Sequence, residues 1–193
     1  MASAPLCSPI DLPALTKALG GLIESARDDV GEVALHVHRD RLIATLTALR
    51  DDHQFQQLME IAGVDYPDRA ERFEVVYCLL SLTKNQRIRV HVSTDEEAAV
   101  PSVTGLWPVA GWLEREVYDM YGVFFSGNND LRRILTDYGF IGHPFRKDFP
   151  LSGHVEMRYD AERQRVVYEP VSIEPREITP RVIREDNYGG GLH

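Results

Sequence analysis

The segment from Phe73 to Leu82 is almost continuously apolar, and a segment of alternating character follows it directly. The first segment reads FEVVYCLLSL, which is typical of a strand buried on both faces. In the second, Arg87 to Val92, apolar residues alternate with polar ones, as in a strand with one solvated face. Lys84-Asn85 between the two segments indicates a hairpin turn. The chain must therefore fold around a sheet that needs a second layer to cover its apolar face.

Helical patterns upstream of this hairpin supply the second layer. Leucines recur at helical spacing after Asp11, which is predicted to cap the first helix, and again after Asp40, which is predicted to cap the second. The expected order is helix, strand, helix and then three strands, at residues 12–23, 33–37, 42–49, 58–66, 73–82 and 87–92. We therefore predict a two-layer α+β domain over residues 1–138, with a mixed or antiparallel sheet and helices on one face.

The sequence changes character beyond residue 138. Five of the eleven prolines fall at positions 144, 150, 170, 175 and 180, with polar and charged residues between them. Prolines at this density favour an extended segment over a second globular core. We predict that residues 139–193 form an arm that wraps a partner protein, with apolar anchors at Tyr159, Tyr168, Val171 and Ile173.

Charge and cysteine content exclude several functions. The net charge of −9 makes nucleic acid a poor partner, because phosphate binding needs a basic surface. Cys7 and Cys78 lie far apart, so this chain cannot supply four thiolates to an iron–sulfur cluster. No GxGxxG motif follows a strand, and no apolar run approaches the length of a membrane span. The N-terminus also lacks the pattern of a secretory signal, so we expect membrane association only through partners.

A third helix is predicted from Pro108 to Tyr121, with Gly122 as its stop. Its apolar stripe, at positions 109, 112, 113, 117 and 120, places Glu116 in the middle of the buried face. A carboxylate there needs a basic partner. The expected partners are Arg132, Arg133, Arg146 and Lys147. Arg115 and Asp119, one turn apart, are expected to pair with each other.

Two kinds of chemistry compete with a structural interpretation of these residues. Glu116, Asp119 and His143 could form the acid–base site of a stand-alone enzyme, but no nucleophile or metal cluster accompanies them. His36 and His38, two apart on a predicted strand, could begin a metal site, but no further ligand stands at diagnostic spacing. A structural ion pair and a solvated strand face are the simpler interpretations.

Four blocks in the second half of the chain carry a specific resemblance. They are ERE at 114–116, DMYG at 119–122, DLRRIL at 130–135 and GHPFRKDFPL at 142–151. In this order they resemble the signature of the 30-kDa (C) subunit of complex I, the NADH:quinone oxidoreductase. The matching signature positions are Glu114, Arg115, Glu116, Asp119, Gly122, Arg132, Arg133, His143, Pro144, Arg146, Lys147 and Asp148. The chain departs from the family at Asn128-Asn129, where a His-Pro pair is usual.

The resemblance implies a structural subunit of the peripheral arm, without catalytic, cofactor-binding or metal-binding residues of its own. FMN and iron–sulfur clusters are then expected in partner subunits, of which the quinone-site 49-kDa (D) subunit and its iron–sulfur neighbours are the chief contacts. The complex transfers electrons from NADH to quinone and translocates protons. The implied location is the cytoplasmic face of the bacterial inner membrane, or the matrix face of the mitochondrial one. The equivalent subunit of a membrane-bound hydrogenase or of a chloroplast-type complex is the alternative within the same resemblance.

Overall fold

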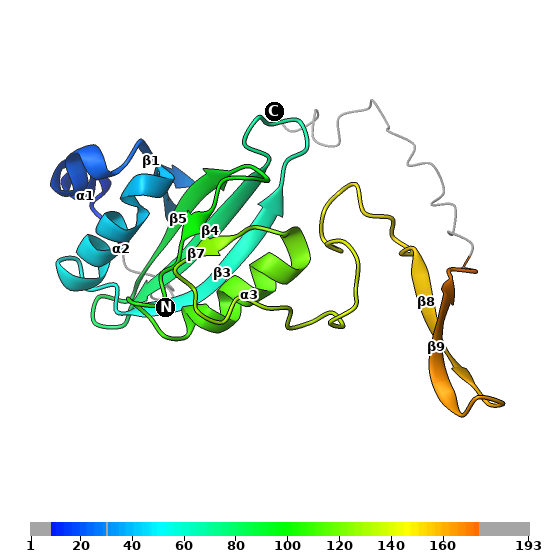
Figure 1. Cartoon of the computed structure of the whole chain (residues 1–193). Coiled ribbons are helices and arrows are strands. Elements are labelled where there is room, and N and C mark those ends of the chain that lie inside the picture. The colour runs from blue at the N-terminus through cyan, green and yellow to red at the C-terminus, as the bar shows by residue number, and fades with distance from the viewer. Residues whose placement is uncertain (1–8, 30, 174–193) are drawn as a thin grey trace, which may run out of the picture. The chain divides into compact units, whose positions relative to one another are not determined.

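The computed structural model describes residues 9–29 and 31–173 (Figure 1). By its contacts the chain divides into two units, Met1–Phe149 and Pro150–His193. Residues 139–149, which the sequence assigned to the arm, belong by these contacts to the first unit. Cys7, most of the N-terminal segment examined for a targeting signal, and the arm beyond residue 173 lie outside the described residues.

The first unit is built on a five-stranded mixed sheet in the order β1-β2-β5-β4-β3. β2 and β5 run parallel, and the other neighbouring pairs are antiparallel. β1 was not predicted, because its sequence SARDD is polar and does not alternate. The strands are β1 (Ser25–Asp29), β2 (Glu32–His36), β3 (Gln57–Asp65), β4 (Phe73–Ser81) and β5 (Gln86–Thr94).

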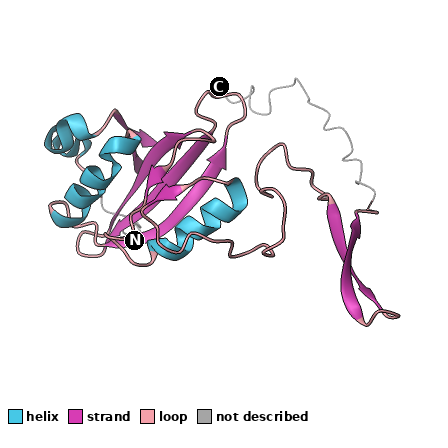
Figure 2. Cartoon of the chain, in the orientation of Figure 1, coloured by secondary structure: helices cyan, strands magenta, loops and turns pink. Residues whose placement is uncertain are grey.

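Three α-helices pack on one face of this sheet (Figure 2). They are α1 (Leu12–Leu19), α2 (Leu42–Asp51) and α3 (Ala110–Tyr121). Their buried leucines, alanine and valine share one core with alternate residues of the strands. The predicted α+β class, with a mixed sheet and helices on one face, is thereby confirmed. The short elements are η1 (Gly20–Leu22), η2 (Arg39–Arg41), β6 (Val100–Pro101) and β7 (Phe125–Ser126).

The predicted helix ends are partly correct. Asp11 caps α1, because its carboxylate accepts a hydrogen bond from the N–H of Ala14 at 3.1 Å. Asp40 does not cap α2, since it lies within η2 and the helix begins at Leu42 without a side-chain cap. α3 begins at Ala110, two residues later than predicted, and ends at Gly122 in the left-handed conformation with φ +81°.

The second unit, in its described part, contains one β-hairpin that the sequence analysis missed. β8 (Val155–Asp160) pairs in antiparallel register with β9 (Arg165–Pro170). The two strands are six residues each and form a sheet of their own. A two-stranded hairpin is marginally stable by itself in water, so it gains most of its stability when one face is buried.

A substitution at Gly63 on β3 tests how closely α3 packs on the sheet. A Cβ at this position would lie 2.5 Å from the ring of Tyr121. We expect Gly63→Ala to lower the free energy of unfolding by about 1–3 kcal/mol, because the new Cβ forces the Tyr121 ring out of its packed position. Chemical denaturation measures this change. In Gly105→Ala the new Cβ would meet nothing within 4 Å, so the free energy of unfolding should stay within about 0.5 kcal/mol. Equal losses in both variants would contradict the packing.

Candidate functional site

Glu114, and not Glu116, is the buried carboxylate of α3. Its side chain is fully buried and accepts hydrogen bonds from the N–H of Val103 (2.7 Å), the hydroxyl of Ser102 (2.8 Å) and the amide of Asn128 (2.8 Å). Burial raises the pKa of Glu114, and the three hydrogen bonds oppose that rise. The carboxylate therefore ties the loop before α3 and the turn after β7 to the middle of the helix.

The prediction that Glu116 is buried is wrong. Glu116 is exposed, and so are Val109 (47 %) and Trp112 (61 %), which had been assigned to the buried stripe. Val117 and Met120 of the predicted stripe are buried, but the rotation of the helix also buries Ala110 and Glu114. Ala110 lies four residues before Glu114 and Val117 three residues after it, so the three side chains share one face of the helix. Trp112 fits the apolar spacing of a buried stripe but is exposed, whereas the small Ala110 is buried.

Asp119 is the second buried carboxylate of α3 and holds the following segment in place. One carboxylate oxygen accepts hydrogen bonds from the N–H groups of Ile134 (3.0 Å), Leu135 (2.7 Å) and Thr136 (2.8 Å). The other accepts from the Thr136 hydroxyl (2.5 Å) and from the Arg133 guanidinium (2.7 Å). Burial by itself would raise the pKa of Asp119, but these donors outweigh it and hold the pKa far below its usual range.

The arginines of this region pair differently from the prediction. Arg115 does not pair with Asp119 but donates to the backbone carbonyls of Arg132 (3.1 Å) and Arg133 (2.9 Å). Arg133 pairs with Asp119 and also donates to the carbonyl of Gly142 at 3.0 Å. Arg132 is exposed and pairs with its neighbour Asp130. Arg115 and Arg133 therefore fasten residues 130–136 to α3.

His143 and Arg146 fasten the next segment to the end of the same helix. His143 Nδ1 lies 2.9 Å from the carbonyl oxygen of Asp119, and Arg146 donates to the carbonyl of Tyr121 at 2.7 Å. Both side chains pass directly over Gly122, where a Cβ would lie 2.6 Å from Arg146 and 2.7 Å from His143. Burial lowers the pKa of His143, so the neutral ring is favoured.

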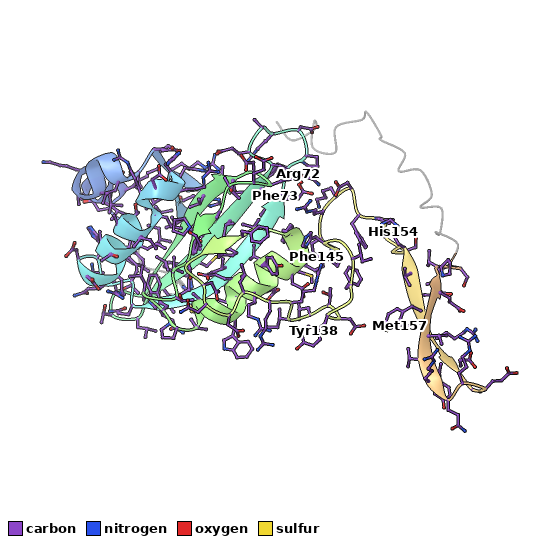
Figure 3. The ribbon with its side chains drawn as sticks, viewed as in Figure 1. Arg72, Phe73, Tyr138, Phe145, His154 and Met157 are labelled. Carbon is purple, nitrogen blue, oxygen red and sulfur yellow. The ribbon has the colours of Figure 1, made fainter. Side chains whose placement is uncertain are left out.

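A third cluster joins this segment to the sheet. Arg72, which Figure 3 labels, makes a paired contact with the buried carboxylate of Asp65, at 2.7 and 2.8 Å. It also reaches Asp148 at 3.0 Å. The N–H of Lys147 also donates to Asp65, at 2.7 Å. The hydrogen bond from Arg72 is the main cause of the lowered pKa of Asp65. The sequence did not predict that Arg72 joins Asp65 to Asp148, because 76 residues separate Arg72 from Asp148.

The geometry does not assemble the acid–base site considered for Glu116, Asp119 and His143. The Asp119 carboxylate already accepts five hydrogen bonds, and His143 contacts its backbone rather than its side chain. Glu116 instead lines a small cavity together with Glu60, Met120 and other residues of β3 and α3. The carboxylate that would have to exchange protons is thus fully occupied as a structural acceptor.

The two histidines considered as metal ligands lie on different elements. His36 ends β2 and stacks on His91, with ring centroids 4.9 Å apart, whereas His38 lies beyond the strand, just before η2. Within residues 9–29 and 31–173, no three histidine, cysteine or acidic side chains are grouped so that they could hold a metal ion. In the same ranges, no helix has both the length and the apolar character needed to cross a bilayer.

The fold and this network define an α+β module in which buried acidic and basic side chains hold irregular segments against one helix. Comparisons with known proteins identify the module. Residues 35–155 match the model of the family described as "Respiratory-chain NADH dehydrogenase, 30 Kd subunit". This chain therefore belongs to that family, which confirms the resemblance seen in the sequence.

The similar proteins carry consistent names. The C subunit of the NADH-quinone oxidoreductase of Ralstonia pickettii is 56 % identical over 190 residues, which cover 93 % of this chain and 95 % of that protein. The protein of the same name from Erythrobacter litoralis is 67 % identical over 82 % of this chain. The chain spans 64 % of the length of that relative, and 52 % of one from Novosphingobium aromaticivorans.

Two solved structures share the fold. The trypsin-resistant fragment of Nqo5 is 35 % identical, with a TM-score of 0.54, and the match covers 62 % of this chain and 97 % of the fragment. A chain from the membrane-bound sulfane sulfur reductase, described as an archaeal respiratory membrane complex, is 26 % identical. Its TM-score is 0.61, and the match covers 72 % of this chain and 83 % of that one.

Replacement of Asp119 by Asn should destabilise the first unit strongly. The variant removes the negative charge that pairs with Arg133. It also places an N–H₂ group against the N–H and hydroxyl donors of residues 134–136. We therefore expect the free energy of unfolding to fall by about 3–5 kcal/mol. Asp130→Asn is the matched control, because the ion pair of Asp130 with Arg132 is exposed and its loss should change the free energy of unfolding far less. Urea denaturation of both variants checks the prediction, and similar losses would refute it.

The low pKa of Asp119 also predicts a dependence on pH. Its contribution to stability is complete above the unfolded-state pKa of about 3.9, and it is lost as the pH falls towards the lower folded-state value. We expect the free energy of unfolding to fall below about pH 4, and to fall less steeply in Asp119→Asn. The raised pKa of Glu114 changes stability with pH in the opposite direction. The quantity to compare is therefore the difference in free energy of unfolding between wild type and Asp119→Asn at each pH. Parallel curves for the two proteins would show that Asp119 does not titrate as described.

Proposed function

We propose that this chain is a non-catalytic structural subunit of the peripheral arm of respiratory complex I. In this role it supports electron transfer from NADH to quinone and the coupled translocation of protons. The observation that carries the proposal is the 56 % identity to the Ralstonia pickettii protein along 93 % of this chain and 95 % of that relative. The geometry supports it, because the charged residues of the site are engaged with one another and with backbone groups.

The FMN and the iron–sulfur clusters of the reaction belong, in this proposal, to partner subunits. The principal partner is the quinone-site 49-kDa (D) subunit with its iron–sulfur neighbours, on the cytoplasmic face of the bacterial inner membrane. The names of the relatives favour NADH as the electron donor over the hydrogenase-type and chloroplast-type alternatives. The stand-alone acid–base enzyme has no support in the geometry of Asp119 and His143.

The hairpin of the second unit supports a role in partner binding. In the β8–β9 register, Val155, Met157 and Tyr159 stand opposite Pro170, Tyr168 and Val166, so all six side chains share one face. Met157 (59 %), Tyr159 (61 %) and Tyr168 (63 %) are exposed. Figure 3 labels Met157 on β8. The opposite face carries charged pairs such as Arg158–Glu169 at 2.8 Å.

We therefore propose that the apolar face of the hairpin is where the arm binds its partner subunit. Tyr159 and Tyr168, two of the predicted anchors, are part of it. Val171 and Ile173 follow directly after β9, and Ile173 is exposed. An exposed face with two tyrosines and a methionine has the composition of an interface core. Residues 139–149 are instead bonded to the first unit, so the binding segment proposed here begins after Phe149.

Purification of native complexes tests the function. A tagged full-length chain, extracted from its own membranes in mild detergent, should co-purify with the flavin-containing and iron–sulfur subunits and with NADH:quinone activity. The isolated chain should show neither NADH oxidation nor a visible chromophore. Co-purification with a hydrogenase, or with no other subunit, would refute the assignment.

Substitution of the hairpin face tests the arm. We expect Met157→Ser with Tyr168→Ser to reduce recovery of the chain in the complex at least about tenfold, because each interface anchor typically contributes more than 1 kcal/mol. Val167→Ser changes an apolar residue on the opposite face and should leave recovery unchanged. Equal recovery of the double variant and the control would contradict the proposed binding face.

A further inference from the structure

Strand β3 forms one of the two edges of the main sheet. In the order β1-β2-β5-β4-β3 this strand has one neighbour, β4, along its nine residues. No backbone hydrogen bond to the other edge of Gln57–Asp65 is found within the described ranges. An open edge presents unpaired N–H and C=O groups, which makes it a template for pairing with another strand.

A cavity of about 150 Å³ lies along this edge, between β3 and α3. Glu60 and Ala62 reach it from one face of the strand, and Ile61 and Gly63 from the other. Residues from both faces of a strand can line one cavity because the strand edge itself is open. Helix α3, which packs against β3 (Figure 1), forms the opposite wall. Val117 and Met120 are among its buried contributors. We call this feature the β3–α3 groove.

One end of the β3–α3 groove is closed. Phe145 lines the cavity, its N–H donates to the carbonyl of Met120 at 3.1 Å, and its ring contacts that of Tyr121. Lys147 is bonded to Asp65 at the same end of β3. An incoming segment would therefore lie beside residues 57–63, where Met59 interrupts the regular register with β4 and is 51 % exposed.

The size and charge of the groove indicate what it binds. Small-molecule sites typically occupy about 300–1,000 Å³, whereas about 150 Å³ accommodates one benzene-sized group. The cavity is thus suited to a single side chain. Its lining includes two exposed carboxylates, Glu60 and Glu116, and no lysine, arginine or histidine. Neither carboxylate has an ion-pair partner among the described side chains.

We infer that the β3–α3 groove is the docking site for an extended, basic segment of a partner subunit. The segment adds to β3 as a sixth strand, pairs lysine or arginine with Glu60 and Glu116, and places one apolar side chain in the cavity. Main-chain hydrogen bonds would supply affinity, and the cavity and the two carboxylates would supply specificity. The inference rests on the proposed membership of a multi-subunit complex, and adds a contact separate from the hairpin.

Hydrogen–deuterium exchange on the native complex tests the strand addition. Amide groups within residues 57–63 that face the open edge should exchange at least about tenfold more slowly in the purified complex than in the isolated full-length chain, because they gain partners. Unchanged exchange in a chain that is present in the complex would overturn the inference and leave the proposed function intact. Absence of the chain from any complex would overturn both. If amide exchange at residues 57–63 is already slow in the isolated chain and slows further as its concentration rises, the edge pairs with a second copy of this chain. That result would overturn the inference of a partner segment.

Charge reversal tests the basic character of the segment. Glu60→Lys with Glu116→Lys should abolish the slowed exchange at residues 57–63, because like charges would then face each other. Glu97→Lys is the matched control, since Glu97 is an exposed acidic residue outside the groove lining, and it should leave the exchange unchanged. Melting temperatures of the isolated variants report whether each chain is folded. Folded double variants that keep the slowed exchange would overturn the assignment of a basic partner.

Discussion

The buried carboxylate of Asp119 holds together the part of the chain that has no regular secondary structure. It accepts three backbone N–H groups from residues 134–136, a hydroxyl and a guanidinium. The three backbone donors lie in a part-buried setting, so removal of the carboxylate would leave them without this acceptor. Arg133, placed by this carboxylate, then reaches Gly142, and His143 contacts the backbone of Asp119 itself. Asp119 is thus the main anchor of residues 133–136, while Arg115, Arg146 and Asp65 hold other parts of the segment from 130 to 149.

The two buried carboxylates of α3 both hold loops against the helix, but their pKa values are shifted in opposite directions. Asp119 has an arginine among its donors, and its pKa is lowered, so its charge is stabilised in the fold. Glu114 has amide and hydroxyl donors without a cation among them, and burial raises its pKa. Both positions join loops to a helix that itself packs on β3. Helix α3 therefore connects the sheet, the irregular segment and the acidic wall of the β3–α3 groove.

The surfaces proposed for binding differ in physical character. The hairpin presents an apolar face on two strands that have little core of their own, so burial against a partner supplies the missing layer. The β3–α3 groove belongs to a well-packed unit and offers backbone hydrogen bonds with two carboxylates at its rim. The first contact is dominated by apolar area and the second by main-chain pairing and charge. A subunit held by two such contacts is fixed in orientation as well as in place.

The sequence by itself determined the α+β class, the main strands, the cap at Asp11 and the stop at Gly122, because these follow from local periodicity and backbone preference. The ordered blocks between 114 and 151 also determined the family. Only the tertiary structure decided that Glu114 is buried and Glu116 exposed, since helix rotation depends on which neighbours pack against it. It likewise decided that Asp119 pairs with Arg133, that Asp65 joins Arg72 and Lys147, and that β8 pairs with β9. These contacts join residues whose sequence separation carries no periodic signal, so their partners become visible only when the chain is folded.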